Sequence, residues 1–451
     1  MPKVTDIPAC PVSPAVRSSG RVTREYQIFL ITPLFGGGVE AGVPDETMPI
    51  RATSIRGQLQ FWWRATRGGR FENHRDLFAR HAEIWGTTEK ASPVEIDVRD
   101  LKPNPVELKA CAEYEWNPRA RQGRGKWDLV WKGPFSRPKD PKLTNSLSYV
   151  LFPFQGKEPR SRNEGPQRPP ANYISNASWL LRLRFPEAIQ DEVEAALNAW
   201  VNFGGLGART RRGCGALFCE EFAPKNAGDL ERWFQDGAFK VGGTVRDWPT
   251  MPDVLLVGEP ELAPSDAWKE VISFLQKFRQ GEEVGRNKGS GNRPGRSRYP
   301  EPETIRRVTA RRSSQYARLA HIPDDAFPRA EFGLPIVFHF QGQGEPPDTV
   351  LYPSDGPDGE PHERMASPLI LKPLALADGK AVPLIMRLAA PPLAGVKLKG
   401  SNVLDLPGTT AVRASRLATY RGSPLAGSTL GSAVEAFLTY ARKYGFREIT
   451  R

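Results

Sequence analysis

The sequence predicts an α+β protein of two tandem ferredoxin-like (RRM-like) domains, interrupted by long basic insertions rich in proline and glycine. Length is the first reason, because 451 residues exceed one ordinary hydrophobic core and favour two domains. The second reason is the order of predicted elements, which reads strand, helix, strand, strand, helix, strand once clearly and once weakly. The third is the content of 42 glycines and 43 prolines, which indicates long connections between regular elements.

The first predicted domain spans residues 23–222 and follows a flexible N-terminal lead at 1–22. Alternation of side chains marks its strands, and a 3.6-residue apolar repeat marks its helices. We expect Thr53 or Ser54 to cap the first helix. In chain order the predicted elements are a strand at 24–34, a helix over 54–67, strands at 93–98 and 178–185, a helix from Pro186 to Trp200, and a strand at 216–222.

The second predicted domain spans residues 223–451 and repeats the pattern less clearly. Its predicted elements are a strand at 253–257, a helix over 265–278, strands at 334–340, 369–376 and 382–389, and a helix over 434–444 that Gly445 ends.

Positive charge is concentrated in a few segments of a chain whose net charge is +12. Residues 51–70 carry five arginines and no acid, and the predicted basic linker 286–318 carries ten basic residues against Glu301 and Glu303. The insertion 101–172 is also basic, and we interpret it as a lid, a partner-binding arm or disorder. Such clustering is typical of proteins that bind polyanions. An anionic membrane surface is a weaker alternative, because no long basic amphipathic helix is evident.

The cysteines and the N-terminal residues indicate the cellular compartment in which we expect the protein. Cys10, Cys111, Cys214 and Cys219 form no CxxC pair, and no Cys/His cluster has zinc spacing. The first residues have no apolar core of signal-peptide length, and no apolar run approaches the roughly 20 residues of a membrane span. We therefore expect a soluble cytoplasmic protein with reduced thiols and without a metal or cofactor.

One stretch, NFGGLGARTRRGCG at 202–215, has the composition of an anion-binding loop. Its glycines allow positive φ and close approach of the backbone, and its arginines fit phosphate oxygens. It matches neither the Walker A spacing nor the dinucleotide fingerprint, and it follows a helix rather than a strand. A phosphodiester backbone is the simplest partner, and a flexible loop with solvated charges is the alternative. The candidate contacts are Gly204, Gly205, Gly207, Arg209, Thr210, Arg211, Arg212, Gly213 and Gly215.

The helix predicted over 54–67 has two different stripes. One contains Ile55, Leu59, Trp62 and Thr66, and it should pack on a sheet. The other mixes arginine with an aromatic ring, which suits contact with phosphates and stacking on bases. For Trp63, packing in the core is an equally weighted alternative. The members of the second stripe and its flank are Arg56, Gln60, Trp63, Arg64 and Arg67.

Four motifs together resemble the RAMP superfamily. They are LITPLFGGG at 30–38, IRATSIRGQLQFWWRA at 50–65, FGGLGARTRRGCG at 203–215 and RMASPLILKPL at 364–374, and they occur in the family's order across both halves. More narrowly, the chain resembles the two-domain, first-numbered RAMP subunit of type III-B (Cmr) CRISPR effector complexes. It departs from that pattern at Cys214, where such proteins often carry an aromatic residue.

The resemblance implies tandem ferredoxin-like domains and a non-catalytic subunit that binds guide RNA and target RNA within a multi-subunit ribonucleoprotein for antiviral defence. It implies a place near the 3′ end of the guide, with other Cmr subunits as protein partners. The implied RNA contacts are Arg51, Arg56, Trp63, Arg64, Arg67 and the loop from Gly204 to Gly215, with Arg364 and Lys372 as weaker candidates in the second domain.

Two other functions remain open from the residues. Some RAMP proteins cut RNA with a histidine as acid or base. His74 and His81, seven residues apart near the basic helix, are the candidates for a metal-independent endoribonuclease, whereas His339 alternates with phenylalanines and should be structural. The second alternative is a structural RNA-binding protein of another ribonucleoprotein. Our prediction is no catalytic residue.

Overall fold

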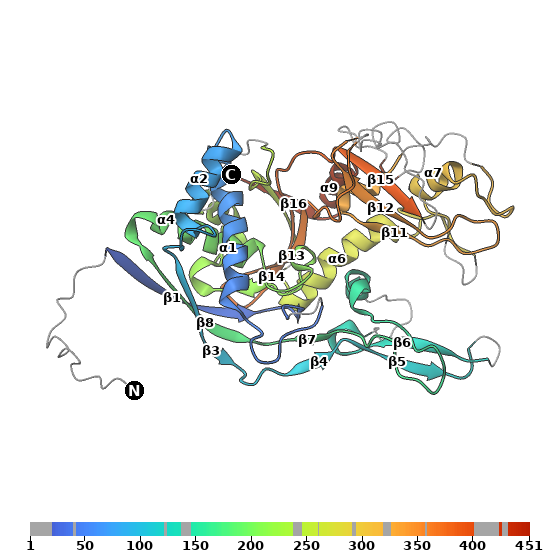
Figure 1. Ribbon diagram of the computed structural model, residues 1–451, viewed down its shortest axis with the longest axis horizontal. Helices are drawn as coiled ribbons and strands as arrows, with labels where there is room; N and C mark the ends of the chain where they lie inside the picture. Colours follow the sequence, from blue (N-terminus) through green and yellow to red (C-terminus); the bar gives the residue numbers. More distant parts are fainter. Residues whose placement is uncertain are drawn as a thin grey trace, which may run out of the picture.

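The computed structural model of the chain shows two four-stranded sheets with helices packed on them, a projecting arm and a smaller three-stranded sheet (Figure 1). The lead expected at 1–22 lies almost entirely outside the described residues, and strand β1 begins at Arg21. The structure describes residues 20–38, 42–120, 124–136, 146–237, 246–259, 261–290, 295–318, 326–356, 359–400, 424–425 and 432–451.

The first sheet has the order β3-β8-β1-β9, and every neighbouring pair is antiparallel. In the chain, its elements follow the order strand, helix, strand, strand, helix, strand. Helix α1 begins at Ala52 after an extended Arg51, so neither Thr53 nor Ser54 caps it. The elements are β1 (Arg21–Leu30), α1 (Ala52–Arg67), β3 (Glu95–Lys102), β8 (Ser178–Pro186), α4 (Gln190–Phe203) and β9 (Leu217–Phe218).

The second sheet repeats this connectivity with the order β13-β14-β10-β16. Its last strand was missed by the sequence prediction because its buried residues, Phe446 and Ile449, are three apart and do not alternate. The elements are β10 (Val254–Gly258), α6 (Pro264–Gln280), β13 (Leu369–Ala375), β14 (Ala381–Arg387), α9 (Ala433–Lys443) and β16 (Phe446–Thr450).

One continuous core joins the two sheets. Apolar side chains of α1 and α4 pack between the inner face of the first sheet and one face of the second, where Leu255, Ile370 and Met386 belong to the same cluster as Ile55 and Trp200. The other face of the second sheet packs on α6 and α9. The second sheet is therefore buried on both faces, and this explains why β13 and β14 are apolar at nearly every position.

The insertion at 101–172 forms an ordered arm in its described parts. Strands β5 (Ala112–Asn117) and β6 (Lys126–Trp131) pair as a hairpin, which projects away from the first sheet (Figure 1). At its base lie the short strands β2 (Leu34–Phe35), β4 (Leu108–Ala110) and β7 (Asn172–Ile174), together with helix α3 (Ser146–Val150). The described strands contradict disorder for these residues, whereas a partner-binding arm and a lid both stay predictions.

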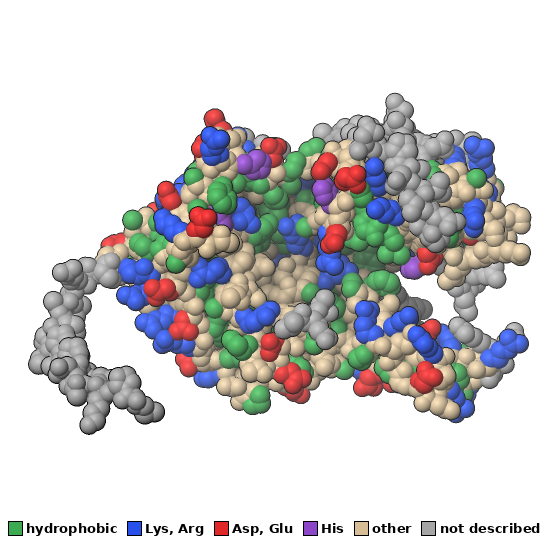
Figure 2. Space-filling model, viewed as in Figure 1, with side chains coloured by type: hydrophobic (Ala, Val, Ile, Leu, Met, Phe, Trp, Pro, Cys, Tyr) green, Lys and Arg blue, Asp and Glu red, His purple; other side chains and the backbone are tan. Residues whose placement is uncertain are grey.

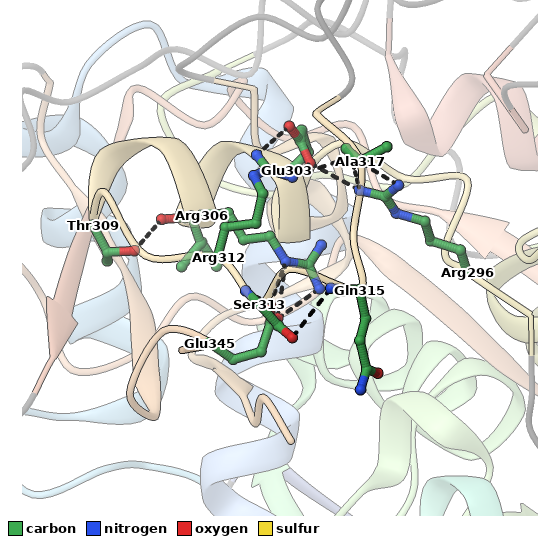
Figure 3. A network of polar contacts seen from close by, with 10 residues as sticks. Arg296, Glu303, Arg306, Thr309, Arg312, Ser313, Gln315, Ala317 and Glu345 are labelled. Atoms are coloured by element: carbon green, nitrogen blue, oxygen red, sulfur yellow. Dashed lines mark hydrogen bonds and ion pairs between the residues drawn. The ribbon is translucent and has the colours of Figure 1, made fainter. Parts of the chain in front are cut away.

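Ion pairs organise the segment predicted as a basic linker. Helix α7 (Glu301–Val308) places Glu303, which is 2% exposed, against Arg296 and Arg312 at 3.0 and 2.6 Å (Figure 3). Arg306 donates to Glu345 at 2.7 Å and lies over the ring of Tyr316. Much of the positive charge counted in this segment is therefore neutralised inside the protein.

The remaining described elements support these layers. Helices α2 (His74–Trp85) and α5 (Leu230–Asp236) accompany α1 and the second sheet, and β11 (Ile336–Phe338), β12 (Thr349–Ser354) and β15 (Gly395–Gly400) form the three-stranded sheet. Part of the strand expected at 334–340 is β11 of this sheet. Within the described ranges, no helix has the length and apolarity needed to span a membrane.

Candidate nucleic-acid interface

The glycine–arginine loop is held in a fixed conformation between the two sheets. Its amides bond to the segment after β1: Ala208 donates to the carbonyl of Phe35 at 2.7 Å, and Gly215 donates to that of Pro33 at 2.9 Å. At Gly207, φ is +78°, and a Cβ there would overlap the Phe35 carbonyl oxygen. These contacts contradict the alternative of a flexible surface loop.

Arg212 is a structural residue, and this corrects its prediction as an RNA contact. Its guanidinium is buried and donates to the carbonyls of Leu369 and Phe332 at 2.8 and 3.0 Å and to the hydroxyl of Ser367 at 3.0 Å. Burial, and then the neighbouring charge of Arg209, lowers the pKa of Arg212 to about 9. Arg212 therefore stays charged at neutral pH and ties the loop to the second sheet.

Two other arginines of the loop reach the surface. The side chain of Arg209 is exposed and has no hydrogen-bond or carboxylate partner within the described part of the chain. Arg211 is half-buried, donates to the Ser367 carbonyl, and lies 5.4 Å from the ring centre of Phe61 on α1. Both are available to an anion.

Lys372 is a positioning residue rather than a surface contact. It is fully buried in β13 and donates to the carbonyls of Gly204 and Val201 at 2.9 and 3.3 Å, at the end of α4. Burial lowers the pKa of Lys372 to about 7. Arg364, the other weaker candidate, is exposed a few residues before β13 and has no partner among the residues described.

Helix α1 does not present its second stripe as predicted. Trp63 is fully buried and donates from its indole nitrogen to Glu192 at 2.8 Å, so its face cannot stack on a base. Arg67 is buried as well and donates to the Asp191 carbonyl at 3.1 Å. The prediction failed because α2 covers this side, and the sequence pattern gave no sign of that contact.

The remaining arginines of α1 are partly accessible. Arg51, Arg56 and Arg64 are half-buried, and Arg56 donates to the Val94 carbonyl at 3.0 Å. Burial lowers the pKa of Arg64. These three remain candidate contacts.

A pocket of about 210 Å³ lies between α1, the loop and β13. Gly204, Thr210 and Arg211 of the predicted loop line it, and the structure adds side chains that the sequence prediction missed. These are Gln58, Phe61, Trp62, Phe203 and Ile370. The spacing of Gln58 and Phe61, three apart beside the apolar stripe of α1, was the available signal.

A second group of arginines extends the positive surface beyond the loop. Arg279 lies in the last turn of α6, and its Nε is buried without a partner among the described residues. Its charge acts on that of Arg209, and the hydroxyl of Tyr149 in α3 interacts with both Arg209 and Arg286. Figure 2 shows a hollow with Lys and Arg side chains between the part that carries α1 and the part that carries β12 and β15.

The candidate histidines do not form a shared site with these arginines. His81 is half-buried against the Trp63 ring, its Nε2 is buried without a partner in the described structure, and burial lowers its pKa. His74 is the first residue of α2, and its ring lies next to Trp248 and 3.8 Å from the carboxylate of Asp247. Within the described ranges, no group of three His, Cys, Asp or Glu side chains is placed to hold a metal ion.

Known proteins similar to this chain share the region that holds the loop. Residues 28–218 match the RAMP superfamily. The Cmr subunit Cmr1-2 of Pyrococcus furiosus is 26% identical over 201 residues, which cover 43% of this chain and 92% of that protein.

Solved structures show weaker similarity over a longer part of the chain. Apo Cmr1 from Pyrococcus furiosus aligns with 82% of this chain and 89% of its own, at 14% identity and a TM-score of 0.40. A chain of the type III-B Cmr-beta complex bound to cognate target RNA aligns over 82% and 94%, at 13% identity and a TM-score of 0.44. The sequence matches carry the comparison: residues 28–218 match the RAMP superfamily, and the chain is similar to a Cmr subunit.

Proposed function

We propose that the chain is a non-catalytic RNA-binding subunit of a type III-B (Cmr) CRISPR effector complex. In this proposal it lies near the 3′ end of the guide RNA and helps to capture target RNA in antiviral defence. Its partners are guide RNA, target RNA and other Cmr subunits, and it acts in the cytoplasm. The relationship to a Cmr subunit and the RAMP match over the loop region support the proposal.

The domain organisation follows from the repeated connectivity. We propose two tandem ferredoxin-like domains, at 23–222 and 223–451, because each sheet has the order of its second, third, first and fourth strands. Their shared core makes one body of the two halves. The loop at 202–215 is where they meet.

One observation carries the RNA-binding role: a rigid loop places Arg211 at the wall of an aromatic pocket and Arg209 near Arg279. Phosphates attract such arginines irrespective of sequence, and single-stranded bases stack on aromatic rings. A single strand that crosses the loop would meet both. Arg51, Arg56, Arg64 and Arg364 would extend this surface, whereas Trp63, Arg67, Arg212 and Lys372 support it from inside.

The positions of the histidines do not favour an endoribonuclease. A general acid or base must reach the substrate, and the Nε2 of His81 is buried behind Trp63. His74 lies at the start of α2, beside Trp248 and away from the loop's aromatic pocket. We therefore assign no cleavage step to this chain.

The test compares two double variants that remove the same charge. Arg209→Ala/Arg211→Ala removes two loop arginines, and Arg182→Ala/Arg184→Ala removes two from the outward face of β8. For single-stranded RNA, we expect the loop variant to bind more weakly and its plot of log K against log salt to be shallower by about 1.4, with parental values for the control. Equal effects of the two variants would contradict the proposed interface.

Membership of the complex needs a separate measurement. The tagged chain should co-purify from its host with other Cmr subunits and with repeat-derived guide RNA. Recovery of only ribosomal or messenger RNA would support the alternative of a different ribonucleoprotein.

A further inference from the structure

We propose that the pocket between α1, the glycine–arginine loop and β13 takes one unstacked RNA base by its acceptor-bearing edge. The inference rests on the RNA-binding function proposed above and names the part of the RNA that this site would read. The ligand class is a single nucleobase, with its phosphates outside the pocket.

The walls of the pocket are flat and apolar. Phe61 is half-buried and lies edge-on to Trp62 at 5.3 Å between ring centres, while Phe203 lies 6.2 Å from Trp62 and Ile370 closes the side of β13. Planar bases that leave a stack are bound in this way, between aromatic or guanidinium planes. Arg211 lies over the Phe61 ring and so joins the wall to the phosphate-binding surface.

An unpaired donor gives the pocket its polarity. The indole N–H of Trp62 lines the pocket and has no acceptor among the described residues, and its nitrogen is not among the buried unpaired atoms, as those of Trp85, Trp179 and Trp248 are. A ligand that displaces solvent from the pocket must supply an acceptor to this donor, because a donor that is buried without one is costly.

Gly204 keeps the space in front of this donor open. A Cβ at this position would lie 2.5 Å from the Trp62 indole nitrogen. Lys372 fixes Gly204 in place by donating hydrogen bonds to the carbonyls of Val201 and Gly204. Gln58 and Thr210 add groups that can both donate and accept.

The size and polarity of the pocket favour a nucleobase over a whole nucleotide or an apolar protein side chain. At about 210 Å³ the pocket is smaller than the roughly 300–1,000 Å³ typical of sites for drug-sized ligands, so it suits one ring system rather than a whole nucleotide. An apolar side chain of a protein partner would fill the volume but would leave the Trp62 N–H unpaired. A base offers carbonyl or ring-nitrogen acceptors together with a flat face.

The experiment uses the full chain and two probes with identical phosphates: oligouridylate and a fully abasic RNA of equal length. The parent should bind oligouridylate more tightly, by about fivefold or more, because stacking of a base on an aromatic side chain is worth at least that. Trp62→Phe keeps the ring but removes the donor, and it should reduce this preference by about two- to tenfold without changing affinity for abasic RNA.

Two further variants separate the pocket from folding. Gln58→Met on the partly exposed side of α1 should also reduce the preference for base-bearing RNA, even if Trp62→Phe proves unstable. Trp127→Phe, which removes an indole donor to the Ser161 carbonyl in the hairpin, should leave the preference unchanged.

The outcomes distinguish this inference from the function on which it rests. Parental binding that is equal for both probes would overturn the base pocket and leave RNA binding intact. Absence of binding to either probe would overturn both. If Trp62→Phe and Gln58→Met impair assembly with other subunits but not the preference for bases, a protein side chain occupies the pocket and the inference is wrong.

Discussion

Arginine serves two opposite purposes within four residues of the loop. The guanidinium of Arg212 is surrounded by backbone carbonyls and a hydroxyl, whereas Arg209 faces solvent. The sequence could show that both are arginines in a glycine-rich loop, but not which one the second sheet would cover. That depends on Leu369 and Phe332, more than a hundred residues away in the chain.

Replacement of Arg212 should therefore affect folding before it affects RNA. Arg212→Lys keeps the charge but cannot reach three acceptors at once. We expect both Arg212→Lys and Arg212→Ala to lower the free energy of unfolding by about 2–4 kcal/mol, because buried acceptors lose their donors. Urea unfolding measures this, with Arg209→Ala as the control that should change it by less than about 0.5 kcal/mol. Equal stability of the two alanine variants would show that the anchoring role is wrong.

The burial of Lys372 should make the stability of the protein depend on pH. Burial lowers its pKa from the usual 10.5 to about 7, so between these values the unfolded chain binds a proton that the folded chain does not. The free energy of unfolding should therefore rise with pH above about 7, by at most about 1.4 kcal/mol per pH unit from this group. Unfolding of the parent and of Lys372→Met from pH 6.5 to 8.5 tests this, and only the parent should show the slope. Parallel curves would mean that the carbonyls of Val201 and Gly204 keep the ammonium charged.

At the scale of elements, the sequence pattern was informative wherever one face of an element is buried. Strand β8 alternates buried and accessible residues along its length, and its predicted range of 178–185 differs from the observed strand by one residue. Helix α2 and strand β16 were missed, because neither has a long regular apolar period. Because α2 was missed, the prediction did not include the contact between α2 and Trp63, and it therefore placed Trp63 at the surface.

Replacement of a glycine by alanine should change the free energy of unfolding in opposite directions at two positions, one in α1 and one in the loop. Gly57 lies on the exposed side of α1, and a Cβ there would meet nothing within 4 Å. Gly57→Ala should raise the free energy of unfolding by about 0.5–1 kcal/mol, since glycine is a poor helix residue. Gly207→Ala should lower it by about 1–3 kcal/mol, because φ is +78° and the Phe35 carbonyl occupies the space. Thermal unfolding measures both, and a neutral Gly207→Ala would show that the loop is not held as described.

At the scale of the whole molecule, net charge overstates the surface that is free for RNA. Glu303 and Glu345 form ion pairs with arginines of the segment that was predicted as a basic linker, and these ion pairs neutralise the charge of those arginines (Figure 3). In the loop, where the two sheets meet, Arg209 and Arg211 have no carboxylate partner among the described residues. Composition predicted a polyanion partner, but only the fold separates arginines that pair internally from those that do not.

The shared core predicts that the two halves do not fold separately. A chain cut after residue 222 would expose the faces of α1 and α4 that pack on Leu255, Ile370 and Met386. We expect such a fragment to lack cooperative urea unfolding and to lose RNA binding, although it retains the whole glycine–arginine loop. Deletion of the hairpin tip at 116–127, with a short glycine–serine turn in its place, is the control, because the hairpin projects from the body (Figure 1). That variant should unfold cooperatively and bind RNA like the parent. If the fragment 1–222 instead unfolds cooperatively and keeps parental affinity, the second sheet contributes neither to the stability of the first nor to the interface, and the contacts of Arg212 and Lys372 with it are dispensable.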